Sequence, residues 1–208
     1  MLVTVRILVS GFEPFLEEAV NPTQRIVNFV NSCEGHERGW DGLDIRGVLL
    51  PVVFDRAFSR LEQERELFKP DVVLSFGLAG GREAFEIEHV ALNFRGGDQS
   101  SRGDNEGRVF NGSIDCAAPL ALPSTLPIET MLEHLNLASV PARRSFSAGS
   151  YVCNDLFFRM QNRLLRTRVK SGFIHVPRLA AEASAETSAS WAWTKFETGI
   201  DAIFKSFI

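Results

Sequence analysis

The sequence has few cysteines, no long apolar run and no excess of basic residues. Three cysteines among 208 residues cannot all pair, which excludes a disulfide-stabilised secreted scaffold. No apolar run approaches the ~18 residues of a membrane-spanning helix, and the N-terminus lacks the regions of a signal peptide. We therefore expect a cytoplasmic chain with no membrane partner, in which a cysteine is either a core residue or a reactive group.

The charge balance also narrows the classes of partner. The formal net charge of −4 provides no positive field for nucleic acid or anionic lipid, so we expect no nucleic-acid partner. With 45% hydrophobic and 23% charged residues, the composition is that of an ordinary globular protein. No proline- or glycine-rich linker divides the chain. We therefore predict a single domain over residues 1–208.

Strand-like and helix-like patterns alternate along the chain. This order predicts an α/β protein, a three-layer α/β/α sandwich with a mostly parallel central sheet. A polar, glycine-rich stretch at 95–111 predicts a long loop of the kind that covers or builds a site. The expected strands are 3–10, 44–53, 71–76, 85–93 and 172–176, and the expected helices are 23–33, 54–68, 129–137, 151–169 and 191–207.

Metal-binding and phosphate-binding motifs are weak or missing. The four histidines include no pair four residues apart, and the sequence has no Cys-x-x-Cys and no His-Glu-x-x-His. The glycine-rich run from Gly77 to Arg82 follows a predicted strand but lacks the Lys-Ser/Thr of a P-loop and the GxGxxG spacing. We interpret it as a tight turn, with phosphate binding as the alternative.

Cys153 stands where a loop of small residues becomes a predicted helix. The unpaired N–H groups of a first helical turn favour a thiolate and can hold an oxyanion. His175, in the strand that follows this helix, can return beside the sulfur as a base, and Glu88 is the best acid to orient it. The simpler interpretation is a small core cysteine, a hydrogen-bonded core histidine and a solvent-facing strand glutamate.

Other candidates depend on their local context. Phe12 and Phe15 flank Pro14 in a predicted loop, where they are either core residues or the walls of a pocket for a small flat ligand. Cys33 and Cys116 lack the helix-start context of Cys153. We interpret both as structural or incidental.

Several segments together resemble one known family. In chain order they are SGFEPF with Asn21-Pro22, GLAGGREAFEIEHVALN, DNEG, STLPI, SAGSYVCND and GFIHVP. They are similar to those of the pyroglutamyl peptidases, cytoplasmic cysteine peptidases that remove an N-terminal pyroglutamyl (5-oxoprolyl) residue. The resemblance implies an α/β/α sandwich, a Cys-His-Glu triad, no metal or other cofactor, peptide substrates and a homo-oligomer, either a tetramer or a dimer.

Residue by residue, the resemblance places the triad on Cys153, His175 and Glu88, the last being the sixth residue after Arg82. It also implies substrate-binding residues on both sides of the nucleophile. Their expected roles are to sandwich the lactam ring, to hydrogen-bond the substrate and to line the pocket before the cysteine, and they are Phe12, Phe15, Asn21, Tyr151 and Val152.

The sequence departs from the family pattern near the site. Glu86 and His89 replace the residues usual around the triad glutamate, and Arg178 stands where an aromatic residue is common. The longer loop leaves Arg95 and Arg102 as alternatives for an arginine near the scissile carbonyl. Two further functions stay open on the sequence: a nucleoside phosphorylase-like enzyme, or a catalytically silent homologue that binds pyroglutamate.

Overall fold

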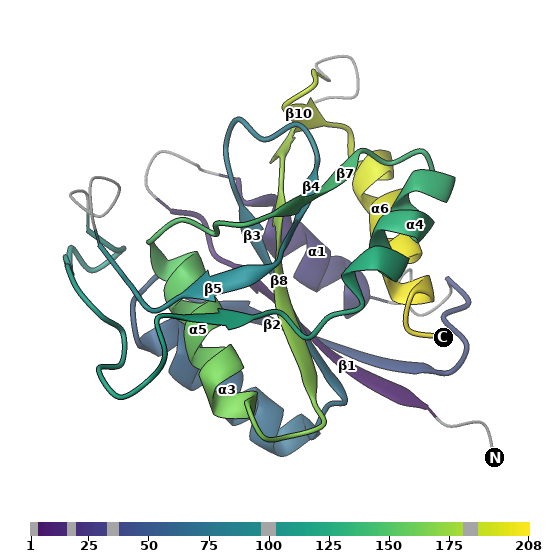
Figure 1. Cartoon of the computed structure of the whole chain (residues 1–208). Helices are drawn as coiled ribbons and strands as arrows, with labels where there is room; N and C mark the ends of the chain where they lie inside the picture. Colours follow the sequence, from purple (N-terminus) through teal and green to yellow (C-terminus); the bar gives the residue numbers. More distant parts are fainter. Residues whose placement is uncertain (1–3, 16–19, 33–37, 97–102, 181–186) are drawn as a thin grey trace.

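The computed structural model describes residues 4–15, 20–32, 38–96, 103–180 and 187–208 (Figure 1). A six-stranded sheet runs through its centre in the order β2-β1-β3-β8-β4-β7. Two further pairs of short strands, β5 with β6 and β9 with β10, lie outside it. The strands are β1 (Val5–Phe12), β2 (Leu43–Leu50), β3 (Val72–Leu78), β4 (Phe85–Glu88), β5 (Val90–Leu92), β6 (Ala121–Pro123), β7 (Ala142–Ser145), β8 (Lys170–Val176), β9 (Arg178–Leu179) and β10 (Ser190–Trp191).

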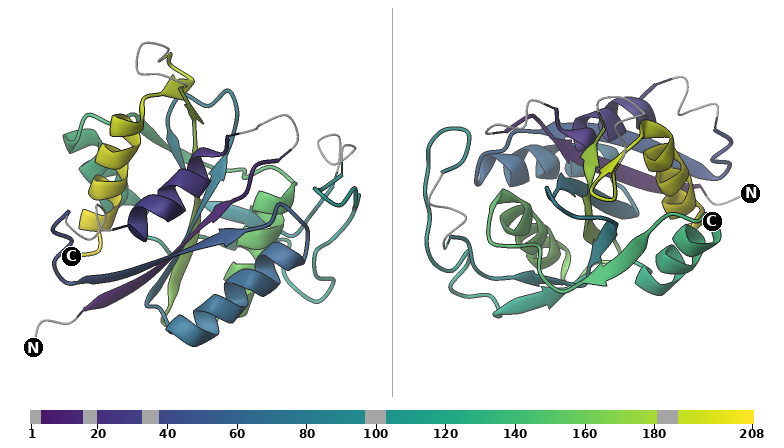
Figure 2. Two further views of the ribbon diagram at one scale, coloured as in Figure 1. Left: turned by 180° about the vertical axis from the view of Figure 1, so that it is seen from behind. Right: turned by 90° about the horizontal axis from the view of Figure 1, so that it is seen from above.

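Helices cover both faces of the sheet, which confirms the predicted α/β/α layers. Seen from above in Figure 2, α3 and α5 lie on one side of the sheet and α4 and α6 on the other. Each face has its own apolar cluster, and α1 contributes to the cluster that includes α4 and α6. The helices are α1 (Pro22–Val30), α3 (Arg56–Phe68), α4 (Ile128–Leu137), α5 (Val152–Leu164) and α6 (Trp193–Lys205). Among the described residues, no helix is both long and apolar enough to cross a membrane.

The sheet is mostly parallel, with one antiparallel junction. Strands β1, β2, β3 and β8 run the same way, whereas β4 pairs with β8 in the opposite direction. In that pair Glu86 lies opposite His175. Side chains alternate between the two faces of a sheet along a strand. Glu88, two residues after Glu86, therefore projects from the same face as His175. The antiparallel junction therefore brings an acid and an imidazole together.

Several predicted boundaries were wrong. The strand expected at 85–93 breaks after Glu88 and continues as β5 in a separate ladder with β6. The strand expected at 3–10 extends to Phe12, so this residue ends β1 rather than lying in a loop. Helix α5 ends at Leu164, because the residues after it are mostly polar and exposed and continue no apolar face.

Short strands were missed because their sequences lack the usual pattern. β7 contains two arginines and β6 contains a proline, so neither reads as a β-branched apolar run. Both lie at sheet edges, where burial selects residues less strongly. β7 pairs with β4 on one side, and its partner strand is fully buried.

Candidate active site

The nucleophile candidate, Cys153, is the second residue of α5. The helix begins after Tyr151, whose side chain makes no capping bond, so the described residues leave the first-turn N–H groups uncapped by a side chain. The buried side chain of Asn154 fixes this turn against β5 and the chain after it. Its Oδ1 accepts from the Leu92 N–H at 2.9 Å, and its Nδ2 donates to the carbonyls of Leu92 and Phe94, both at 2.8 Å. The position of the sulfur is thus set by a rigid helix start.

An imidazole and a carboxylate complete a row with the sulfur. His175 Nδ1 lies 2.7 Å from Glu88 Oε1, and both side chains are buried. Burial by itself opposes the imidazolium, but hydrogen bonds to Cys153 and Glu88, together with the charges of both, raise the pKa of His175 to about 9. The ring is therefore held between a thiol and an acid and favours its protonated form.

Gly77 gives the sulfur its space. It pairs with His175 across β3 and β8. A Cβ atom at this position would lie 2.7 Å from the Phe173 ring and 3.0 Å from the Cys153 Sγ. Real Cβ atoms essentially never show the first distance, and the second is tighter than most real Cβ contacts. A side chain at residue 77 must therefore displace the thiol or the aromatic ring beneath it.

We expect Gly77→Ala to lower kcat/KM by about 10- to 100-fold, because a shift of the nucleophile on the order of 1 Å spoils its alignment. The overpacking also costs about 1–3 kcal/mol of unfolding free energy. Gly199→Ala is the matched control, since its Cβ would press on Phe85 at 2.4 Å in the α6 layer. Steady-state assays and urea unfolding should show both variants destabilised but only the first impaired in catalysis. Equal activity of the two would contradict this role for Gly77.

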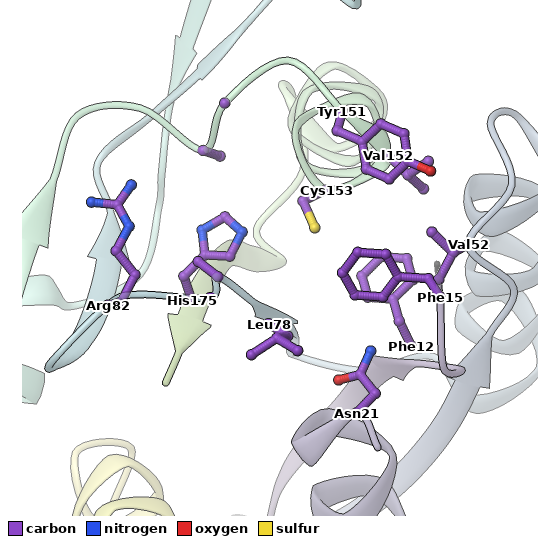
Figure 3. A pocket seen from close by; sticks show the side chains of 14 residues that line it. Phe12, Phe15, Asn21, Val52, Leu78, Arg82, Tyr151, Val152, Cys153 and His175 are labelled. Carbon is purple, nitrogen blue, oxygen red and sulfur yellow. The ribbon is translucent and has the colours of Figure 1, made fainter. Parts of the chain in front are cut away.

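Cys153 and His175 face a pocket of about 500 Å³ (Figure 3). In Figure 3, Phe12, Phe15, Asn21 and Val52 lie on one side of the sulfur. The lining residues come from the ends of β1, β3 and β8, from the loops after β1, β2, β3 and β7 and from the start of α5. They are Phe12, Phe15, Asn21, Val52, Leu78, Ala79, Gly80, Arg82, Ala148, Gly149, Tyr151, Val152, Cys153 and His175.

Asn21 holds the phenylalanine loop to α1. It is the N-cap of that helix, and its Oδ1 accepts from the Thr23 N–H at 3.0 Å and from the Thr23 hydroxyl at 2.8 Å. Its Nδ2 donates to the Glu13 carbonyl at 3.1 Å. The second N–H of this amide has no partner among the described residues. A structural cap thus also presents a donor at the pocket.

The aromatic wall is tied to the long loop predicted at 95–111. The Tyr151 hydroxyl donates to the Gly103 carbonyl at 2.7 Å, and its ring contacts those of Phe15 and Phe54. Burial and the nearby charges of Asp104 and Cys153 raise the pKa of Tyr151 to about 12, so the phenol stays neutral. The loop therefore supports this wall.

Arg95, one of the two alternatives for an arginine near the scissile carbonyl, lies elsewhere. Its guanidinium pairs with Asp55 at 2.9 Å and Asp155 at 3.4 Å, stacks on the Phe110 ring and does not line the pocket. Burial raises the pKa of Asp155 despite its arginine partners. Arg102 and Cys33 lie outside the described part of the chain. Cys116 is exposed and does not line the pocket.

The structure brings together the predicted triad residues and the predicted substrate-binding residues, but not Arg95. Cys153, His175 and Glu88 form the row, and all five predicted substrate-binding residues line the pocket. The solvent-facing alternative for Glu88 is wrong, since its side chain is buried, as is that of Glu86. Sequence reasoning missed Arg82 and Asn154. The one local signal for each is its position: Arg82 directly follows a glycine turn, and Asn154 directly follows the nucleophile.

An α/β sandwich with a thiol, an imidazole and a carboxylate in a row at one pocket is the architecture of a cysteine-type hydrolase. Comparison with known proteins gives the particular family. A family model described as pyroglutamyl peptidase matches residues 5–205. The chain belongs to the pyroglutamyl peptidase family, which argues against the phosphorylase alternative.

Relatives in sequence and structure agree. A pyrrolidone-carboxylate peptidase of Vibrio vulnificus is 36% identical over 197 residues, 94% of this chain and 89% of that protein. One of Pyrococcus furiosus is 39% identical over 176 residues, covering 83% and 81% of the two chains. The crystal structure of pyroglutamyl peptidase I from Bacillus amyloliquefaciens superposes with a TM-score of 0.86 at 28% identity, covering 97% of this chain and 96% of that one. A mutant pyrrolidone carboxyl peptidase from Pyrococcus furiosus also gives 0.86, at 32% identity and 97% of both chains.

Proposed function

We propose that this protein is a cysteine exopeptidase that removes N-terminal pyroglutamyl residues from peptides. The observation that carries the proposal is the row Cys153, His175 and Glu88, which opens into a pocket walled by Phe12 and Phe15. Family membership supports the same activity.

In the proposed mechanism Cys153 is the nucleophile. Its thiolate attacks the carbonyl that joins pyroglutamate to the next residue, and the first-turn N–H groups of α5 stabilise the oxyanion. The C–N bond breaks as the His175 imidazolium protonates the leaving amine, which leaves a thioester on sulfur. The neutral imidazole then takes a proton from water, whose oxygen hydrolyses the thioester and regenerates the thiolate. Glu88 is a positioning residue that holds the ring and stabilises its charge.

Specificity follows from a ring pocket without charge. The residues on the phenylalanine side are aromatic, aliphatic or amide, and the Tyr151 phenol is neutral. A lactam has no charged amine, so it enters this surface between Phe12 and Phe15 while the remaining N–H of Asn21 donates to its carbonyl. An ordinary N-terminal ammonium would lose its hydration with no counter-charge there, which costs several kcal/mol.

The test compares chromogenic amides of pyroglutamate, proline and alanine, each with and without iodoacetamide. We expect turnover of the pyroglutamyl amide alone and its loss after alkylation. Proline is the matched control because it keeps the five-membered ring but carries a charged amine. Binding of pyroglutamate without hydrolysis would instead identify a catalytically silent homologue, and turnover that survives alkylation would exclude a thiol mechanism.

Three wider expectations remain proposals. The chain forms one domain over 1–208, supported by a central sheet whose strands come from residues 5–176. It acts in the cytoplasm, supported by its low cysteine content. It assembles as a homo-oligomer, supported by the family resemblance.

A further inference from the structure

The pocket extends beyond the catalytic row. With the lactam ring between Phe12 and Phe15 and the scissile carbonyl at Cys153, the leaving nitrogen must lie at His175, which protonates it. The next residue of the peptide then continues past the imidazole. Figure 3 shows Arg82 on that side of His175, opposite the phenylalanines. Ala79, Gly80 and Gly149 complete the lining there with little side-chain bulk.

Arg82 is the charged group of this extension. Among the described residues that line the pocket, it is the one side chain outside the Cys153–His175 pair with a formal charge. Its side chain is 40% exposed, and Nη1 lies 2.9 Å from the Glu86 Oε2. Glu86 is 1% exposed, so the carboxylate anchors the guanidinium from below. A fixed arginine at a pocket mouth presents positive charge and hydrogen-bond donors to a ligand.

The anchoring carboxylate does not cancel this charge. Glu86 also accepts from Arg143 Nε at 2.7 Å, so two guanidinium groups share one buried carboxylate. The three side chains together carry a net charge of +1. Glu83, the residue directly after Arg82, accepts a hydrogen bond from Ser188 at 2.6 Å and does not line the pocket. The Arg82 guanidinium on the leaving-group side therefore keeps positive charge that Glu86 alone does not balance.

We propose that Arg82 makes the enzyme prefer substrates with a carboxylate on the residue that follows pyroglutamate. The carboxylate has two sources, an acidic side chain at that residue or the free C-terminus of a pyroglutamyl dipeptide. This inference rests on the proposed peptidase function and adds a substrate class to it. The Arg82 side chain is partly exposed, so its ion pair with a substrate carboxylate has a modest effect that is sensitive to salt.

Peptide pairs that differ in one charge measure the effect. pGlu-Glu-amide against pGlu-Gln-amide tests the side-chain source, and pGlu-Ala with a free carboxylate against pGlu-Ala-amide tests the C-terminal source. At low ionic strength we expect at least one pair to favour the acid by about threefold to fivefold in kcat/KM. The same ratio should fall toward 1 as salt is raised.

Three substitutions are expected to change the kcat/KM ratio of the preferred peptide pair in three different ways. Arg82→Gln should bring the ratio to about 1, whereas Glu86→Gln should raise it because it removes the neutralising carboxylate. Arg144→Gln is the matched control. It lies on the same strand as Arg143 and pairs with Glu129, away from the pocket lining, so its ratio should stay at the wild-type value.

Two different failures are distinguishable. Equal kcat/KM within both peptide pairs, or a salt-independent ratio in the wild type, overturns the role of Arg82 while leaving the peptidase activity intact. Absence of hydrolysis for every pyroglutamyl peptide overturns the proposed function itself. If Arg82→Gln fails to fold, the salt titration and Glu86→Gln still decide the matter.

Discussion

Replacing Cys153 by alanine should abolish hydrolysis of a pyroglutamyl amide, with a loss in kcat of about 10⁴-fold or more. The first-turn N–H groups and the imidazole remain, but no atom is left to form the thioester. The loss should appear in single-turnover as well as steady-state assays, because acylation itself is removed. Pyroglutamate binding, measured by calorimetry, should persist because the phenylalanine walls are unchanged.

Cys116→Ala is the control for this experiment, since Cys116 is an exposed thiol outside the pocket. We expect it to keep wild-type kcat/KM and wild-type sensitivity to iodoacetamide. Thermal unfolding of both variants checks that the fold is retained. A Cys153→Ala protein that still turns over the amide would show that another group performs the attack.

The second large effect concerns Glu88. Glu88→Gln should lower kcat/KM by about 10²- to 10⁴-fold, because an amide neither stabilises the imidazolium nor fixes one ring tautomer. It should also change the pH profile. The folded enzyme holds the pKa of His175 at about 9 against an ordinary value of 6.5, so the imidazolium is present below that pH and is lost above it. Removing the negative charge lowers this pKa, and the alkaline limb should move to lower pH.

Glu86→Gln serves as the matched control for Glu88. Glu86 lies two residues earlier on β4, is equally buried and pairs with arginines rather than with the imidazole. We expect a smaller loss of activity on the pyroglutamyl amide and an alkaline limb close to that of the wild type. The reverse order of the two variants would assign the triad acid to Glu86. An unmoved limb in Glu88→Gln would show that this carboxylate does not control His175.

The parts of the site that the sequence predicted are those with local signals. Cys153 follows a run of small residues and begins an amphipathic helix, and His175 lies in a short apolar strand that follows it directly. Both patterns arise from neighbours in the chain. Glu88 was selected by its place after a glycine turn, and the family resemblance supports the same residue. The layers of the fold follow from the same alternation of strand and helix.

What the sequence did not predict depends on partners far along the chain. The antiparallel direction of β4 is set by its pairing with β8, which lies almost ninety residues away. The burial of Glu86 depends on Arg143, and the displacement of Arg95 from the pocket depends on Asp55 and Asp155. Ion pairs of this kind produce no periodic pattern in the sequence, because each partner alone looks like an ordinary charged surface residue of its own segment.

The amide clamp of Asn154 has a consequence for how such enzymes diversify. Its bonds hold Leu92 and Phe94, and two backbone bonds of 2.9 Å join Arg95 to Gly112 just beyond them. The paired residues Arg95 and Gly112 therefore fix the two ends of the loop between them. Changes between these two points can reach the pocket wall through Gly103, whose carbonyl holds the Tyr151 hydroxyl, while Asn154 keeps the start of α5 and the sulfur in place. Selectivity toward new peptides can thus evolve separately from the hydrolytic chemistry.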